Sequence, residues 1–133
     1  MEEEVTIDIP KETTLPILYI KDAVDFLVSL WKAKHPKKRI YIVGGVPVSI
    51  KDLIETLQSH VPKLKVNVRV DKDAERVARA WTVLTQMMIK MGMDKLYRKI
   101  EDLGWELKYS SVEKIVGDFV ADVRSNKELY TGY

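Results

Sequence analysis

Cysteine is absent from this chain of 133 residues, and histidine occurs only at His35 and His60. The lack of cysteine excludes disulfide bonds, thiolate metal sites and a cysteine nucleophile, and it is typical of a reducing compartment. The two histidines are far apart in the sequence and neither lies in a cluster of acidic residues, so we expect no metal site. Because a Gly-x-Ser-x-Gly motif is also missing, a serine hydrolase has no support.

Long apolar runs and a strong charge of either sign are also missing. No stretch of about 18 apolar residues is present to cross a bilayer, and the acidic start at 1–4 differs from the basic start of a secretory leader. The net charge is +2 with acids and bases interspersed, which gives no strong attraction to nucleic acid or to a membrane surface. We therefore expect a cytoplasmic protein that binds neither.

Two signatures of nicotinamide-dependent enzymes are absent as well. A dinucleotide site uses glycines at a strand-to-helix turn, and the sequence has no Gly-x-x-Gly-x-x-Gly loop. Hydride transfer can use a tyrosine activated by a lysine four positions later, and no tyrosine of this chain has that partner. We expect no catalytic residue, no cofactor-binding residue and no bound cofactor in this chain alone.

The spacing of apolar residues predicts a small α/β to α+β layered domain with about three short strands and four to five helices. Extended segments are expected over 5–9, 15–20, 40–43 and 66–70, and helices over 22–35, 50–61, 73–91, 94–103 and 112–123. The segment 40–43 is β-branched and nearly all apolar, as expected of a strand covered on both faces. We expect one domain over 1–133, made of an amino-terminal strand region (1–10), a main segment (11–125) and a polar tail (126–133).

Several residues are predicted to define the backbone geometry. Asp22 stands where a helix begins and would cap it, with contact to a substrate as the alternative. Ser49 with Asp52 and Ser110 with Glu113 resemble capping boxes. Gly92 and Gly104 are expected at helix ends.

The Gly44-Gly45 pair lies between the expected strand at 40–43 and the next helix. We interpret it as a tight turn rather than a phosphate loop, because Pro47 removes one of the amide donors that a phosphate would need.

Two helices carry apolar stripes. Val24, Leu27, Val28 and Trp31 share one helical face, and Trp31 and Trp81 are both expected to pack in the core. Methionines cluster at the end of the long helix and just beyond it, and they could form core, an adaptable binding surface or a face that needs a partner: Met87, Met88, Met91 and Met93.

A set of motifs in a fixed order resembles the last part of the extended short-chain dehydrogenase/reductase family. The motifs are the run Leu15–Ala23, Ile40–Gly45, Val48–Leu53, Leu103-Gly104-Trp105 and Tyr109-Ser110. This family contains nucleotide-sugar epimerases, dehydratases and short-chain-type L-threonine dehydrogenases. The last type looks most similar, through Thr14–Ile20, His60–Pro62 and Trp81. The segment 80–93 departs from it, because a longer methionine-rich helix replaces a shorter segment with a proline after the tryptophan.

The resemblance implies a carboxyl-terminal, substrate-side domain of an NAD-dependent enzyme that is not catalytic alone. It implies NAD for the parent enzyme, and Arg69 and Trp81 as candidate substrate contacts, with a surface ion pair as the alternative for Arg69. The structural motif residues would be Asp22, Gly44, Gly45, Ser49, Gly104 and Trp105. The expected partner is the missing cofactor domain or a second copy. The alternative function is a self-standing, non-catalytic interaction domain that oligomerises through its apolar helices.

Overall fold

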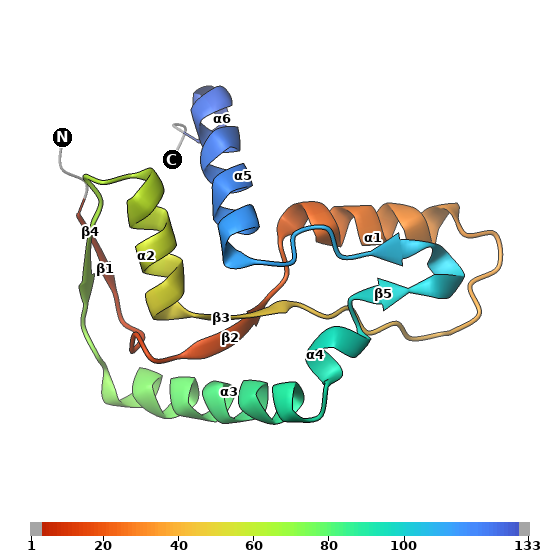
Figure 1. Cartoon of the computed structure of the whole chain (residues 1–133), viewed down its shortest axis with the longest axis horizontal. Helices are drawn as coiled ribbons and strands as arrows, with labels where there is room; N and C mark the ends of the chain where they lie inside the picture. Colours follow the sequence, from red (N-terminus) through yellow and green to blue (C-terminus); the bar gives the residue numbers. More distant parts are fainter. Residues whose placement is uncertain (1–3, 131–133) are drawn as a thin grey trace.

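The computed structural model describes residues 4–130 and shows a mixed α/β arrangement of short elements (Figure 1). In chain order these are β1 (Glu4–Ile7), β2 (Thr14–Ile17), α1 (Ile20–Lys32), β3 (Val46–Ser49), α2 (Ile50–His60), β4 (Lys65–Val68), α3 (Lys72–Lys90), α4 (Met93–Leu96), β5 (Lys99–Ile100), the 3₁₀ turn η1 (Glu101–Leu103), β6 (Trp105–Glu106), α5 (Val112–Ser125) and α6 (Lys127–Tyr130). The predicted α/β class is confirmed. The strands are more numerous and shorter than expected.

The described strands form three separate two-stranded ladders instead of one layer. Strands β1 and β4 pair in parallel, whereas β2 pairs with β3 and β5 pairs with β6 in antiparallel fashion. Helices α2 and α5 pack against each other, and α3 lies along β2 at one side of the molecule (Figure 1). The pieces are held together by side-chain packing around β2, β3 and β6 rather than by a continuous sheet.

The expected strand at 40–43 is the main error of the sequence-based prediction. This segment forms no strand, and the strand of this region is β3, which starts at Val46. Ile40 and Ile42 are 79% and 56% exposed. A β-branched run forms a strand only when a neighbouring strand pairs with its backbone, and the described chain places no such strand beside it.

The expected helix at 94–103 is also wrong beyond its first turn. Helix α4 ends at Leu96, and the chain continues into the hairpin of β5 and β6 with η1 at its tip. Gly104 ends η1 with a positive φ of 62°. A residue with a side chain would be strained in this backbone conformation. Gly92 likewise has a φ of 70° directly after α3, as a helix-terminating glycine does.

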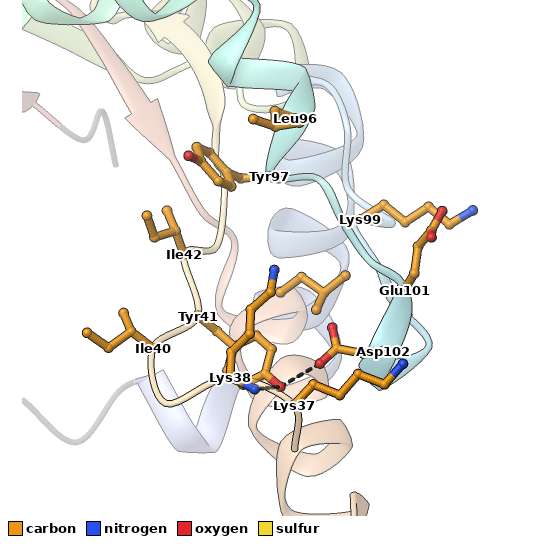
Figure 2. A pocket seen from close by; sticks show the side chains of 11 residues that line it. Lys37, Lys38, Ile40, Tyr41, Ile42, Leu96, Tyr97, Lys99, Glu101 and Asp102 are labelled. Atoms are coloured by element: carbon orange, nitrogen blue, oxygen red, sulfur yellow. Dashed lines mark hydrogen bonds between the residues drawn. The ribbon is translucent and has the colours of Figure 1, made fainter. Parts of the chain in front are cut away.

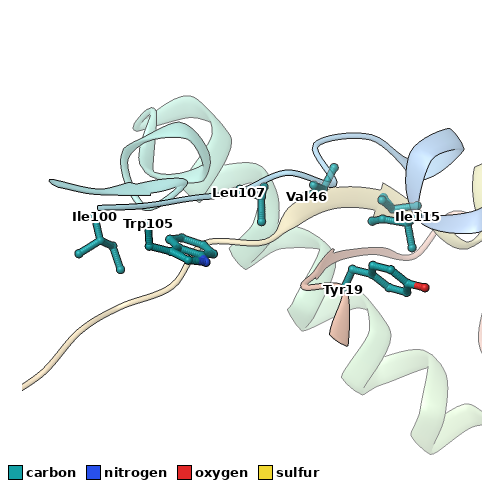
Figure 3. Close-up of a cluster of buried hydrophobic side chains, with 7 residues drawn as sticks. Tyr19, Val46, Ile100, Trp105, Leu107 and Ile115 are labelled. Atoms are coloured by element: carbon teal, nitrogen blue, oxygen red, sulfur yellow. The ribbon is translucent and has the colours of Figure 1, made fainter. Parts of the chain in front are cut away.

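A cluster of buried apolar side chains joins the ladder of β2 and β3 to the β5–β6 hairpin and to α5. It contains Tyr19, Val46, Val48, Ile100, Trp105, Leu107 and Ile115 (Figure 3). Trp105 is the largest of them at 1% exposure, and the ring of Phe26 packs edge-on against it with centroids 5.7 Å apart. Helix α1 therefore joins this core through Phe26.

The most apolar stripe of α1 faces solvent, which contradicts the expected core position of Trp31. Val24, Leu27, Val28 and Trp31 are all exposed, and Trp31 reaches 85%. Helical spacing fixes which residues share a face but not which face meets the core. On α1 the inward face carries Asp22 and Phe26 instead.

The N-terminal caps of α2 and α5 can be compared with the two predicted capping boxes. The Ser49 hydroxyl accepts a hydrogen bond from the Asp52 backbone N–H, so the predicted cap of α2 is confirmed. Helix α5 is capped by Ser111, whose hydroxyl accepts from the Lys114 N–H, and not by Ser110 as predicted. The capping-box pattern favoured Ser110, which has Glu113 three residues later, over the adjacent Ser111, which has Lys114 there.

Gly44 and Gly45 are sites of close backbone approach rather than a tight turn. The Gly44 N–H donates to the Tyr97 carbonyl over 2.8 Å. A Cβ at Gly45 would lie 2.8 Å from the Ile17 carbonyl oxygen, inside the normal contact limit. The pair lets the chain pass closely between α4 and β2 on its way into β3.

We expect Gly45→Ala to lower the free energy of unfolding by about 1–3 kcal/mol, because a backbone carbonyl must move to admit the methyl group. Gly117→Ala is the matched control, since the nearest heavy atom to its added Cβ lies 3.9 Å away on the His60 ring. Urea unfolding followed by circular dichroism measures both. Equal stability of the two variants would contradict the close approach.

Candidate functional site

A cavity with several charged lining residues lies between the 37–42 segment and the α4–β5 region (Figure 2). It has a volume of about 660 Å³. Its charged lining residues are Lys37, Lys38, Lys99, Glu101 and Asp102. Ammonium groups and carboxylates together suit a ligand that carries both charges or several hydroxyl groups. We call this cavity the lysine pocket.

One side of the lysine pocket is fixed by Tyr41. Its hydroxyl donates to the Asp102 carboxylate over 2.6 Å and accepts from the Lys38 backbone N–H over 3.2 Å (Figure 2). Burial and the bond to Asp102 raise the pKa of Tyr41, and the same bond lowers the pKa of Asp102. Tyr41 thus remains a protonated phenol. Its role is to hold the 38–41 segment against Asp102, not to act as a base.

Asp22 holds two backbone amides and does not cap α1 as predicted. It is 1% exposed, and its two oxygens accept from the N–H groups of Lys108 and Tyr109 at 2.9 and 3.0 Å. Lys108 and Tyr109 belong to the connection between β6 and α5. A carboxylate accepts from two amides at once because each oxygen offers free lone pairs. Asp22 therefore ties the first helix to the last third of the chain.

A second, partly buried cluster joins two tyrosines and a lysine on Asp118. The hydroxyls of Tyr19 and Tyr109 donate to its two oxygens at 2.8 and 3.2 Å, and Lys21 forms an ion pair with it. The hydrogen bond from Lys21 makes the largest contribution to lowering the pKa of Asp118, and the bond from Tyr19 makes the next largest. Burial, together with the hydrogen bond to Asp118, raises the pKa of both tyrosines. Both phenols stay protonated, so this arrangement connects α1 to α5 and supplies no phenolate.

Trp81 is half-exposed at the wall of an apolar groove between β2 and the first half of α3, and its expected core position is wrong. The groove has a volume of about 580 Å³ and an almost wholly apolar lining. It is lined by Ile9, Thr13, Leu15, Asp73, Ala74, Val77, Ala78 and Trp81. We call it the α3 groove. Its lining suits apolar side chains and offers little to orient a polar substrate.

Arg69 follows β4 and forms an exposed ion pair with Asp8. Its Nε and one terminal nitrogen lie 3.0 and 3.4 Å from the two carboxylate oxygens. The structure does not bring Arg69 into the lysine pocket or the α3 groove, so the two predicted substrate contacts, Arg69 and Trp81, are not in one site. Their substrate roles stay predictions.

Two features are absent from residues 4–130: a possible metal centre and a helix that could cross a bilayer. In that range no three residues among histidine, aspartate and glutamate are grouped so that they could hold a metal ion. Nor does the same range contain a helix with the length and apolar character to cross a bilayer.

These clusters were hard to predict from the sequence. Tyr41 and Asp102 are 61 positions apart, and Tyr19 and Asp118 are 99 apart. Local spacing carries no signal for such pairs. The buried position of Asp22 could be suspected because an aspartate occurs among the apolar residues of an amphipathic helix, but its partners could not.

No protein-family model matches the chain, and a comparison of its sequence with curated proteins finds no match. The structure is similar to those of L-threonine dehydrogenases. The enzyme from Phytophthora infestans superposes with a TM-score of 0.67 at 16% identity over 92% of this chain. A GalE-like L-threonine dehydrogenase from Cupriavidus necator in its holo form gives 0.65 at 19% identity over 91%. The enzyme from Clostridium difficile gives 0.61 at 15% identity over 93%.

These matches establish the fold of the chain and show how much of each matched structure the chain covers. The chain accounts for 37% of the length of each of these three structures. The fold is thus that of one part of an L-threonine dehydrogenase, in agreement with the motif order seen in the sequence. The remaining part of those proteins has no counterpart in this chain.

Proposed function

We propose that the chain is the substrate-side domain of an NAD-dependent dehydrogenase or epimerase of the extended short-chain type, inactive without a cofactor domain. The observation that carries this proposal is the match of more than nine-tenths of the chain to a little over a third of several L-threonine dehydrogenases. The parent reaction is oxidation at a carbinol carbon, of a small hydroxy-amino acid or of a nucleotide sugar. The lysine pocket, with ammonium and carboxylate groups side by side, suits either one.

The bare surface of α1 and the segment 40–42 supports a cofactor domain as partner. The apolar stripe of α1 faces solvent, and Ile40 and Ile42 project to one side of an extended segment while Tyr41 projects to the other (Figure 2). Side chains that point alternately to the two sides of an extended segment are typical of a β-strand. An extended segment of this kind can pair with the edge of a sheet. A β-sheet edge in the partner would pair with 40–42, and the stripe of α1 would cover the face of that sheet.

The first test is cofactor binding. We expect the chain alone to bind no NADH and to oxidise no alcohol, because the phosphate loop and the tyrosine–lysine pair are both missing. A titration followed by NADH fluorescence measures this. Saturable binding tighter than about 100 μM, near −5.5 kcal/mol, contradicts the proposal.

The second test is reconstitution. The gene region directly upstream of the Met1 codon is expected to encode a glycine-rich loop and a Tyr-x-x-x-Lys pair, and the two polypeptides should copurify when coexpressed. Leu27→Glu on the bare stripe of α1 should abolish copurification, whereas Leu84→Glu on α3 should leave it intact, since both leucines are exposed to a similar degree. An upstream region without those motifs would contradict the proposal.

A further inference from the structure

Helix α3 presents its small residues to its own domain. Ala78 and Thr85 are buried, and Thr82 is half-buried. The Thr14 backbone N–H donates to the Thr82 hydroxyl, and the Thr85 hydroxyl donates to the Thr14 carbonyl. The contact between α3 and β2 is thus made by methyl groups and hydroxyls, which hold the helix close to the strand.

The large apolar residues of α3 lie on the adjacent face of the helix, beside the buried small residues. Val77, Trp81, Leu84 and Met91 are about half or more exposed, and Met88 is half-buried. Together with Ala74 they recur at alternating steps of three and four residues, which is the spacing of a helix that pairs with another helix. We call Ala74, Val77, Trp81, Leu84, Met88 and Met91 the α3 seam.

Charge is absent from the α3 seam and from the flank beside it at Ala80 and Met87. Loss of charge at the centre of an apolar patch is the compositional mark of a protein–protein contact. A monomer seldom leaves so long an apolar stripe in water. The α3 seam therefore requires a partner whose surface is apolar and elongated.

We propose that this partner is a second copy of the chain, with the two α3 helices antiparallel about a two-fold axis between Trp81 and Leu84. In this register the seam is self-complementary. Trp81 faces Leu84 of the second copy, Val77 faces Met88, and Ala74 faces Met91, so a large residue always meets a smaller or flexible one. A parallel pair would set Trp81 against Trp81.

The α3 groove, which shares Ala74, Val77 and Trp81 with the α3 seam, gives further support for this occupant. The groove lies at the first half of α3, where Ala74 and Val77 form part of its wall. The antiparallel register brings Met88 and Met91 of the second copy to these two residues. Two unbranched methionine side chains suit an apolar groove of about 580 Å³, and the two-fold axis fills both grooves of the dimer in the same way.

The dimer is tested with two neighbouring residues of equal exposure. Leu84 is 52% exposed on the α3 seam, and Val83 is 50% exposed but lies outside it. We expect sedimentation equilibrium to show a dimer for the unmodified chain and for Val83→Glu, and a dimer dissociation constant at least about 100-fold larger for Leu84→Glu. Far-UV circular dichroism confirms that each variant is folded. A monomeric unmodified chain, or equal dimerisation of both variants, overturns the proposal.

The register is tested by crosslinking, which the absence of native cysteine makes unambiguous. An equimolar mixture of Val77→Cys and Met88→Cys chains is expected to oxidise to a mixed disulfide, because these positions face each other across the axis. Each variant alone is expected to stay reduced. Disulfides within the Val77→Cys sample alone indicate a parallel pair and overturn the antiparallel register.

This dimer stands apart from the proposed function. The cofactor domain is assigned to α1 and 40–42, and the second copy to α3, on another side of the molecule (Figure 1). Loss of dimerisation in Leu84→Glu with retained copurification of the upstream polypeptide would separate the two contacts. A failure of reconstitution leaves the sedimentation result unaffected, and the reverse also holds.

Discussion

Replacement of Asp22 by asparagine is expected to lower the free energy of unfolding by about 3 kcal/mol, nearly as much as replacement by alanine. The carboxylate accepts two backbone N–H groups while buried at 1% exposure. Asparagine offers one acceptor oxygen and turns an NH₂ donor toward the second amide, so one buried amide loses its partner. Hydrogen bonds to a charged group contribute about 1.5–3 kcal/mol each, and an unsatisfied buried donor costs a similar amount.

The matched control is Asp25→Asn on the same helix. Asp25 pairs with Lys108 at the surface with a side chain 40% exposed, so its loss should cost less than about 1 kcal/mol. Urea unfolding of Asp22→Asn, Asp22→Ala, Asp22→Ser and Asp25→Asn gives the comparison. A helix cap would tolerate asparagine and serine but not alanine, so near-normal stability of Asp22→Asn and Asp22→Ser would restore the capping interpretation and contradict the anchoring role.

Local signals predicted the elements whose structure depends on local interactions. Ser49 was recognised as a cap because the bond to the Asp52 N–H spans three residues, and the glycine ends at Gly92 and Gly104 follow from backbone sterics. Helices α2, α3 and α5 were placed within a few residues of their observed bounds, since helical bonds are local. The α/β class followed from the same signals.

The errors occur where a segment depends on what it packs against. The apolar spacing of α1 was read correctly, but its stripe faces water. The β-branched segment 40–43 has the composition of a strand buried on both faces, yet it has no strand pairing, and Ile40 and Ile42 are exposed. Both errors have one physical cause: helical spacing and β-branched composition indicate that a segment suits burial, but they do not say what covers it.

The candidate site was the least predictable part, because it is assembled from distant positions. The lysine pocket combines 37–42 with 96–102, two segments whose approach depends on the close passage at Gly44. The two predicted substrate contacts have different surroundings: Arg69 pairs with Asp8, and Trp81 lines the α3 groove. The methionine-rich departure at 80–93, by contrast, was a visible signal, and it coincides with most of the α3 seam.

Replacement of Trp105 by alanine is expected to cost about 4 kcal/mol and to unfold a large share of the molecules at 37 °C. Trp105 is 1% exposed at the centre of the buried cluster, where it lies beside Ile100 and packs against Phe26 (Figure 3). Deletion of so large a side chain removes its transfer free energy and leaves a cavity that the short β5–β6 hairpin cannot close by a backbone shift alone. A loss of this size is a large fraction of the stability of a domain of this length.

Trp105→Phe separates packing from polarity at the same position. The indole N–H of Trp105 is buried and has no hydrogen-bond partner among the described residues. Phenylalanine keeps most of the ring volume and removes that donor, so the two effects oppose each other and the cost should be about 1 kcal/mol. Trp31→Ala, at a residue 85% exposed, should change stability by less than about 0.5 kcal/mol. Urea unfolding followed by circular dichroism ranks the three variants. A Trp31→Ala cost equal to that of Trp105→Ala would mean that α1 buries its stripe in solution, which would contradict the bare face on which the cofactor-domain contact rests.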